Sequence, residues 1–554
     1  MKHPQRRRVG RRLAAFAAGL GLLGAAGFAN PAFARSRGGQ SAETLTPIQH
    51  IVVIFQENVS FDHYFATYPY AANTDGTTFE PAKDHRGTPT VNGLGTLVEG
   101  EPSGVLLTAN PNTYSGSRAN PFRLSHSQAS TCDQDHNYGA EQLAFDFGLM
   151  DNFPDTVGSG SCGGFDYGHG NAIVMGYFDG NTVTGVWNYA QHYAISDNSF
   201  GTTFGPSTPG ALNLIAGSTY GAKIITGGSP KVVATNGSGI GTLVGDLDPA
   251  GDPCSGGTTI GMTGTNIGDL LNAKGVSWGW FEGGFDLQTT NPNGTTGCNR
   301  SSPATPANGG PMQDYIPHHE PFQYYASTQN LNHTRPSVPA AMYGTSADTG
   351  ANHQYDINDL FAAMQAGNMP AVTFIKAPGW GDGHAGYSDP LLEQTFLVNT
   401  INTIEKSKFW MNTAIIINYD DSDGWYDHQM NPIVNSSALT NSNQAQYGDN
   451  LTGTGKCGNG APLLTDDNGN PIQGRCGYGP RLVFMVLSPY AKQNYVDHTL
   501  TDQSSIIRFI EDNWGLPRIG NGSYDAIAGP IANMFDFADR ENAEPLILDP
   551  ATGD

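Results

Sequence analysis

Short runs of apolar residues, each too short for a helix, recur along the chain between residues 50 and 487. None of them alternates with polar residues, which is the pattern expected of strands that are covered on both faces of a sheet. They predict five strands of one buried sheet. The runs are HIVVIF (50–55), VSWGWF (276–281), AVTFI (371–375), TAIIIN (413–418) and RLVFMVL (481–487).

Two longer segments have the spacing of apolar residues that is typical of helices. In residues 389–409, Asp389 supplies a helix cap and Pro390 a first helical position. The segment 501–515 predicts a second helix that ends at Gly515. Strands that alternate with helices indicate an α/β fold, here a three-layer sandwich with a mostly parallel central sheet.

The first 34 residues have the features of an export signal. A basic start is followed by an apolar middle and by the small-x-small ending Ala32-Phe33-Ala34. The Arg11-Arg12 pair resembles a twin-arginine signal, and a general secretory signal is the alternative. We expect cleavage after Ala34, a single large domain over residues 35–554, and a secreted or periplasmic protein.

The chain is strongly acidic, with 27 Lys and Arg against 50 Asp and Glu and a formal charge of −23. Removing residues 1–34 takes away six of the basic residues and no acidic ones, which leaves −29. This balance argues against nucleic acid and against anionic membrane surfaces as partners. Beyond the signal no apolar run approaches 18 residues, so no integral membrane association is expected.

Six cysteines, in a compartment that is expected to be oxidising, favour disulfides over metal thiolates, and none of their spacings is C-x-x-C. Six cysteines allow fifteen connectivities. Proximity in the sequence favours Cys132–Cys162, Cys254–Cys298 and Cys457–Cys476, which would fasten long loops.

Acidic and amide side chains follow two of the predicted strands. Glu57 and Asn58 come after the first, and Asp420 and Asp421, with Asp423, come after the fourth. Because the carboxyl ends of parallel strands meet at one edge of a sheet, these residues could converge. A solvated Asp-rich turn is the alternative, but adjacent carboxylates repel each other unless a cation compensates. The oxygen set suits one divalent ion, which could be Ca, Mn, Mg or Zn.

Four histidines and one serine complete the candidate chemistry. His136, His318, His319 and His384 lie in polar loops, where each alone would be an ordinary surface or structural histidine, but together they could stabilise an oxyanion. Ser207 lies between Pro206 and Pro209, which indicates either a prolyl surface turn or a nucleophile held at a helix start. No G-x-S-x-G motif is present.

Seven ordered motifs between about residue 46 and 515 resemble the bacterial phospholipase C and acid phosphatase family, a branch of the alkaline phosphatase-like superfamily. These motifs are IFQENVSFDHYFATYP, CDQDHNYGAEQLAFDFGLMDNF, YAISDNSFGTTFGPSTPG, HHEPFQYY, GDGHAGYSDP, YDDSDGWYDH and LSPYAKQNYVDHTLTDQSSIIRFIEDNWG. The resemblance implies an alkaline phosphatase-like fold and a phosphoserine mechanism with Ser207 as nucleophile. It also implies metal ligands and histidines around the transferred phosphoryl group, namely Glu57, Asn58, Asp420, Asp421 and Ser207 for the metal and His136, His319, His384 and His318 for the phosphoryl group.

The chain departs from many lipase-type members of that family. They have Thr at the Ser207 position and a following Pro-Asn-Arg, whereas this chain continues with Thr208-Pro209-Gly210-Ala211 and offers no Asn or Arg to hold the phosphate. YDDSDGWYDH and HHEPFQYY look closer to the acid phosphatase branch. We therefore expect an exported metal-dependent phosphomonoesterase of acid phosphatase type. A phospholipase C that releases diacylglycerol and a phosphorylated head group is the alternative, and a noncatalytic exported binding protein is a minor one.

The role of two further groups is predicted to be structural. Asp62 and His63 follow the first metal-ligand pair but are expected to belong to a loop or helix start. Two sets of aromatic side chains could form a rim for a lipid or choline, but core packing is the simpler interpretation. They are Trp278, Trp280 and Phe281, or Phe322, Tyr324 and Tyr325.

Overall fold

The five predicted strands belong to one eight-stranded sheet in the computed structural model, in the order β18-β15-β19-β1-β20-β21-β8-β22. Its strands are β1 (His50–Gln56), β8 (Ala194–Ser196), β15 (Trp278–Glu282), β18 (Gln354–Asp356), β19 (Val372–Lys376), β20 (Thr413–Tyr419), β21 (Phe484–Leu487) and β22 (Tyr495–Asp497). The structure describes residues 43–554 apart from 83–87, 96, 99–100, 103, 306, 308–309, 337–349, 452–456 and 458–460. The predicted export signal, residues 1–34, lies outside the described residues.

The centre of the sheet is parallel. β1 pairs with β19 on one side and with β20 on the other, so that Ile51 lies opposite both Val372 and Ala414. β15 pairs in parallel with β18 and β19, and β22 with β8, whereas β21 runs antiparallel to both β20 and β8. The prediction of a mostly parallel sheet is confirmed, with the run 481–487 contributing its one antiparallel member.

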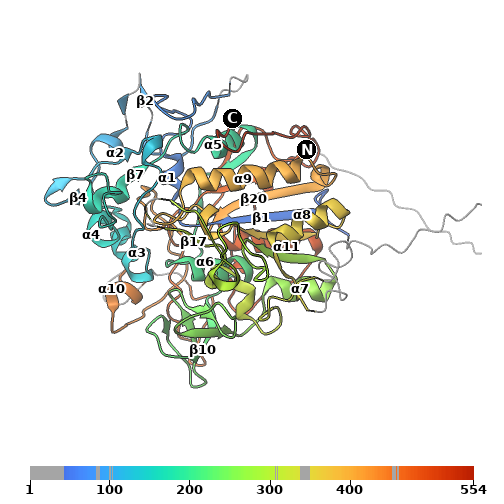
Figure 1. Ribbon diagram of the computed structural model, residues 1–554. Coiled ribbons are helices and arrows are strands. Elements are labelled where there is room, and N and C mark those ends of the chain that lie inside the picture. The colour runs from blue at the N-terminus through green and yellow to red at the C-terminus, as the bar shows by residue number, and fades with distance from the viewer. Residues whose placement is uncertain are drawn as a thin grey trace, which may run out of the picture. The chain divides into compact units, whose positions relative to one another are not determined.

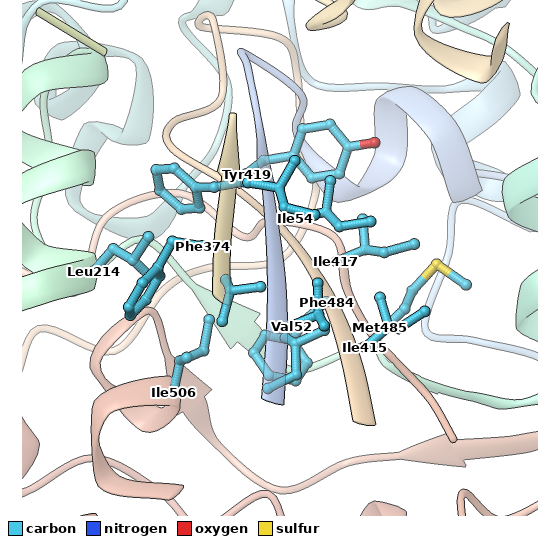
Figure 2. Packing of buried hydrophobic residues seen from close by; sticks show 14 of the residues in the cluster. Val52, Ile54, Leu214, Phe374, Ile415, Ile417, Tyr419, Phe484, Met485 and Ile506 are labelled. Carbon is cyan, nitrogen blue, oxygen red and sulfur yellow. The ribbon is translucent and has the colours of Figure 1, made fainter. Parts of the chain in front are cut away.

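Helices cover both faces of this sheet, which gives the three predicted layers (Figure 1). On one face lie α9 and α5, and on the other α6, α7 and α11. Figure 2 shows Leu214 of α6 and Ile506 of α11 beside sheet residues Phe374 and Val52. The helices are α5 (Thr184–His192), α6 (Ser207–Ala216), α7 (Ile267–Lys274), α8 (Ile357–Ala366), α9 (Pro390–Glu405) and α11 (Ser504–Trp514).

Both predicted helices are present, and each has one end where it was expected. The other ends differ: α9 stops at Glu405 and not at 409, and α11 begins at Ser504 because Thr501 and Asp502 form β23. The side chain of Asp389 accepts hydrogen bonds from the amides of Leu391 and Leu392, which caps α9 as predicted. α11 ends at Gly515, whose φ of 59° is the left-handed conformation that glycine adopts without steric cost.

A second sheet of five strands follows α6 in the sequence and was not predicted. Its order is β11-β12-β10-β14-β13. Its strands are β10 (Tyr220–Thr226), β11 (Val232–Val233), β12 (Ile240–Leu243), β13 (Asp248–Pro249) and β14 (Thr259–Met262). The shorter elements are β2 (Leu97–Val98), β3 (Glu101–Pro102), β4 (Thr113–Tyr114), β5 (Ser117–Arg118), β6 (Phe122–Arg123), β7 (Gly176–Tyr177), β9 (Ser199–Phe200), β16 (Ser301–Ser302), β17 (Met312–Gln313), β23 (Thr501–Asp502), α1 (Phe61–Phe65), α2 (Val105–Thr108), α3 (Tyr138–Phe145), α4 (Phe153–Thr156) and α10 (Gln444–Tyr447).

The long loops are crosslinked as predicted. Disulfides join Cys132 to Cys162, Cys254 to Cys298 and Cys457 to Cys476. Among the residues that the structure describes, no helix combines the length and the hydropathy that a membrane span requires.

The groups that were expected to be structural are buried in the fold. Asp62 accepts hydrogen bonds from Arg481 (2.9 Å) and His428 (2.7 Å), and the ring of His63 stacks on Trp425 at 3.9 Å. All the aromatic side chains that could have formed a lipid rim are buried, which confirms the packing interpretation for them. They are Trp278, Trp280, Phe281, Phe322, Tyr324 and Tyr325.

Candidate active site

Polar side chains at the ends of β1, β19 and β20 meet at one edge of the sheet. The amide of Asn58, just after β1, donates to Asp420 Oδ1, just after β20, over 2.8 Å, although the two residues lie 362 positions apart. Lys376, the last residue of β19, forms a buried ion pair with Glu57 Oε1. The predicted convergence of residues from distant strands is therefore present in the structure.

Ser207 is the first residue of α6 and faces this edge of the sheet. Its Oγ lies 2.9 Å from Glu57 Oε2, 3.1 Å from Asp421 Oδ2 and 3.3 Å from Asn58 Oδ1. The start of α6 can come this close because residue 210 is glycine: a Cβ there would overlap the main chain of Asp420. Gly210 thus lets the helix start reach the strand end.

The oxygen atoms around Ser207 fit a divalent cation. The Ser207 hydroxyl has one proton and can satisfy one acceptor, but three acceptor oxygens approach it within 3.3 Å. Asp420 Oδ2 is also buried and has no hydrogen-bond partner. Carboxylate and amide oxygens are hard ligands, which suit Mg²⁺, Ca²⁺ or Mn²⁺ and also occur at zinc sites.

Burial and mutual repulsion dominate the electrostatics of this group. Burial, followed by the charge of Asp420, raises the pKa of Glu57 well above its usual value, and the same two causes raise the pKa of Asp421. Burial alone would lower the pKa of Lys376, but the charges of Glu57, Asp420 and Asp382 outweigh it and raise that pKa. The site therefore stabilises positive charge, as a cation site must.

The four predicted histidines lie at different depths around Ser207. His319 is buried, with Nδ1 3.5 Å from Glu57 Oε1, and burial and then the charge of Lys376 lower its pKa well below the usual value. His136 Nδ1 lies 3.1 Å from Asp423 Oδ1, and its ring meets that of His384 edge-on at 6.0 Å. His318 is further out, 3.4 Å from Asp248 and in edge contact with His319. The structure thus brings three of them to the carboxylates and leaves His318 at the rim.

Three residues of the site carried no predicted role. Lys376 ends a buried apolar run, and a lone cation at such a position is the signal that could have identified it. Asp382, in the following loop, lies 4.0 Å from His319 Nδ1, and its main-chain oxygen accepts from the Glu57 amide over 2.9 Å. Asp423 was noted only as part of an acidic run, but its Oδ1 accepts from Asn58 Nδ2 over 3.1 Å.

A cavity of about 340 Å³ opens beside Ser207. Its lining includes Pro206, the residue before Ser207, and His136. Three carboxylates and one lysine give it an acidic balance, because Asp133, Asp135 and Asp246 face Lys231. Ser207 itself is not part of this lining.

The profile of the Phosphoesterase family matches residues 48–517, and the chain belongs to this family. It is 24% identical over 513 residues to the "Non-hemolytic phospholipase C" of Pseudomonas aeruginosa, covering 91% of this chain and 59% of that protein. It is 22% identical over 528 residues to "Phospholipase C A" of Mycobacterium tuberculosis, covering 92% and 81%. The chain thus spans about three fifths of the length of the Pseudomonas relative.

Solved structures give more distant similarities. A protein in the alkaline phosphatase superfamily from Vibrio parahaemolyticus aligns with a TM-score of 0.26 and 13% identity, over 61% of this chain and 62% of that one. The murine ectonucleotide pyrophosphatase/phosphodiesterase 5 aligns with a TM-score of 0.29 and 12% identity, over 64% and 95%.

Proposed function

We propose that the protein is a metal-dependent phosphoric ester hydrolase in which Ser207 attacks the phosphorus atom. The observation that carries this proposal is the position of Ser207 Oγ, at a helix start and within 3.3 Å of oxygens from Glu57, Asn58 and Asp421. Membership of the Phosphoesterase family supports it.

The side chains supply three parts of such a reaction. Glu57, Asn58, Asp420 and Asp421 would hold one divalent cation, which when bound lowers the pKa of the serine hydroxyl and neutralises phosphoryl charge. Ser207 gives its hydroxyl proton to a neighbouring carboxylate such as Glu57, whose Oε2 lies 2.9 Å away, and its Oγ forms a bond to phosphorus as the bond from phosphorus to the leaving oxygen breaks. The departing alkoxide takes a proton from an imidazole at this edge of the sheet. Water then hydrolyses the phosphoserine. His319, His384 and His136, with His318 at the rim, are the imidazoles available.

For the substrate we propose a phospholipid first and a phosphomonoester second, which reverses the order expected from the motifs. The named relatives are phospholipases C. The charge of the site also favours a phospholipid over a phosphomonoester. Lys376 is already paired with Glu57, and the segment after Ser207 offers no Asn or Arg to hold a phosphate. A diester carries one negative charge and a monoester up to two, so the diester suits this acidic site better.

One surface feature also favours a lipid substrate. Phe147, Leu149 and Met430 are 56%, 63% and 51% exposed, and Gly148 packs directly against Met430. Phe147 has a φ of 56°, a conformation that is costly for a bulky residue and that places it outside the helix. We name these three side chains the apolar turn. The turn follows the C-terminal end of α3, whose first residue, Tyr138, comes two positions after His136. Adjoining exposed apolar side chains are a feature of interaction surfaces.

The proposal is tested by measuring hydrolysis of an aryl phosphomonoester and of phosphatidylcholine vesicles, with and without chelator. Ser207→Ala and chelation should each abolish both activities, whereas Ser218→Ala, a partly buried serine just beyond α6, should keep them. Acid quenching during turnover should trap phosphate on the Ser207 peptide. Hydrolysis that survives both Ser207→Ala and chelation would disprove the mechanism, and no turnover on either ester would leave a binding protein.

The same assays decide the substrate. With Phe147→Ser and Leu149→Ser combined, we expect slower hydrolysis of vesicles and an unchanged rate on the soluble monoester. Ile225→Ser removes an equally exposed apolar side chain, 56% exposed on β10, and should change neither rate. Fast monoester hydrolysis with negligible head-group release would restore the acid phosphatase interpretation.

Export is proposed as well. It rests on the signal-like segment of residues 1–34 and on three disulfides, which form in oxidising compartments. Sequencing the N-terminus of protein recovered outside the cytoplasm should give a chain that starts at Arg35.

A further inference from the structure

We propose that the second sheet carries a binding site for one neutral sugar unit. This inference goes beyond the proposed function and does not depend on it. The site is a cavity of about 270 Å³ between the start of β10, the residues after β14, the C-terminal end of α6 and the segment 519–521. Its volume lies just below the range of about 300–1,000 Å³ that is usual for small-molecule sites, so it suits a ligand of the size of one hexose.

The cavity lies at the far end of α6 from the proposed nucleophile. Ser207 is the first residue of α6, whereas Ala216, the last residue, lines the cavity. At 1.5 Å per residue these two positions are about 14 Å apart along the helix axis. Figure 1 shows the second sheet, labelled at β10, on the other side of α6 from β1. The cavity is therefore separate from the active site.

The wall of the cavity is uncharged. Among the described residues that line it, none has a charged side chain. The cavity beside Ser207, in contrast, contains three carboxylates and a lysine. An ionic ligand in the uncharged cavity would lose its water without gaining an opposite charge, which is costly. We therefore infer a neutral ligand.

Five polar side chains on the wall have free hydrogen-bonding capacity. The hydroxyl groups of Thr265 and Tyr325 and the carboxamide of Asn521 form no hydrogen bond with any residue that the structure describes. The hydroxyl groups of Ser218 and Tyr220 each accept one hydrogen bond, from a main-chain amide over 3.3 Å and from a carboxamide over 3.1 Å. Both keep a proton that they can donate. Such a set suits a ligand with several hydroxyl groups, which both donate and accept.

Tyr325 is the strongest indication of a missing partner. The residue is only 3% exposed and lines the cavity. Most buried hydroxyl groups in proteins have a hydrogen-bond partner, because a buried one without a partner costs free energy. A ligand hydroxyl group in the cavity would supply the partner that the described residues do not.

The remaining wall is apolar and favours a sugar over water alone. Ala216, Leu464 and Ile519 line the cavity together with the polar groups. Water would leave this apolar surface hydrated, whereas a sugar has C–H faces as well as hydroxyl groups and can contact both parts of the wall. The rings of Tyr220 and Tyr325 offer additional apolar surface to a C–H face.

The test is saturation-transfer NMR of unphosphorylated sugars in the presence of the purified protein, which detects weak ligands and requires no turnover. The probes are glucose, galactose, mannose, N-acetylglucosamine and inositol. We expect at least one of them to bind with a dissociation constant in the millimolar range. Glucuronate, which adds a carboxylate to the hexose ring, should bind more weakly than the tightest neutral probe. No binding by any probe, or tighter binding of glucuronate, would overturn the proposal.

Tyr325→Phe tests whether the sugar binds in this cavity. It keeps the ring and removes one hydrogen-bonding group, which should weaken sugar binding at least about fivefold. The control is Tyr70→Phe, at a tyrosine that is 38% exposed and outside the cavity, and its affinity should equal that of the parent. An unchanged affinity of Tyr325→Phe would overturn the assignment to this cavity.

Asn521→Gly covers the case in which Tyr325→Phe does not fold. It removes an exposed carboxamide and keeps the local φ of 51° accessible, so it should fold and bind the sugar more weakly than the parent. An affinity of Asn521→Gly equal to that of the parent would also count against this cavity.

Two further measurements separate this inference from the proposed function and identify the source of the sugar. Ser207→Ala should bind the sugar as the parent does, so the loss of the proposed nucleophile leaves the test unaffected. Retention of the parent, but not of Tyr325→Phe, on a polysaccharide of the sugar that binds would identify a unit of a polymer as the ligand. Binding of the free sugar alone would identify a free ligand.

Discussion

Replacing Lys376 by methionine tests how the buried charges at the site are balanced. The ammonium group of Lys376 is paired with Glu57, and both side chains are 1% exposed. Methionine keeps most of the volume but leaves Glu57 without its cation. Removing one partner of a buried ion pair typically costs about 3–5 kcal/mol, because the remaining charge stays desolvated. The equilibrium constant for unfolding should therefore rise about 10²–10⁴-fold.

The assay is denaturant unfolding of the chelator-treated protein, followed by fluorescence and by circular dichroism. Lys223→Met is the control, because Lys223 is exposed on β10 and its replacement should change the free energy of unfolding by less than about 0.5 kcal/mol. Adding a divalent ion should restore more stability to Lys376→Met than to the parent, since the cation no longer competes with the ammonium for Glu57. Equal effects of the two substitutions in the metal-free protein would refute this account of the site.

Three further predictions concern the surroundings of the site. Burial raises the pKa of Glu393 from 4.5 to about 7, so its contribution to stability is fully present below pH 4.5 and is lost as pH rises through 7. Above pH 7 the free energy of unfolding of Glu393→Gln should exceed that of the parent by up to about 3 kcal/mol. The same pH dependence of unfolding in both proteins would contradict this. Gly210→Ala should reduce turnover at least tenfold with a smaller effect on the free energy of unfolding, because the new Cβ overlaps the Asp420 main chain. Turnover equal to that of the parent would show that the close contact between the start of α6 and Asp420 is not required for activity. Replacing both Cys132 and Cys162 by serine should lower the free energy of unfolding by about 2–4 kcal/mol, and an unchanged midpoint would contradict it.

Local composition made the central strands and their helices predictable. The run 50–55 is apolar at every position after His50, and this is possible only for a strand that is buried on both faces, as β1 is. The start of α9 and the end of α11 followed from Asp389 and Gly515, since capping depends on neighbouring residues alone. Sequence proximity likewise gave the three disulfides.

Very short strands, and strands that mix polar with apolar residues, could not be predicted from local composition. β8, β18 and β22 have three residues each, and the strands of the second sheet mix polar with apolar positions. The direction of β21 was missed for a different reason: a strand with the same buried pattern can pair either way, and the connecting loops decide which.

The sequence by itself determined which chemical groups this protein can use: Ser207 between two prolines, Glu57-Asn58 and Asp420-Asp421 after buried runs, and four histidines. Only the tertiary structure decided which of them meet. In the structure Lys376 is paired with Glu57, one oxygen of Asp423 has no hydrogen-bond partner, and Asp62 is paired with Arg481. The physical reason is range: strand and helix patterns depend on residues a few positions apart, whereas buried charges interact over a few ångströms between segments that the fold alone brings together.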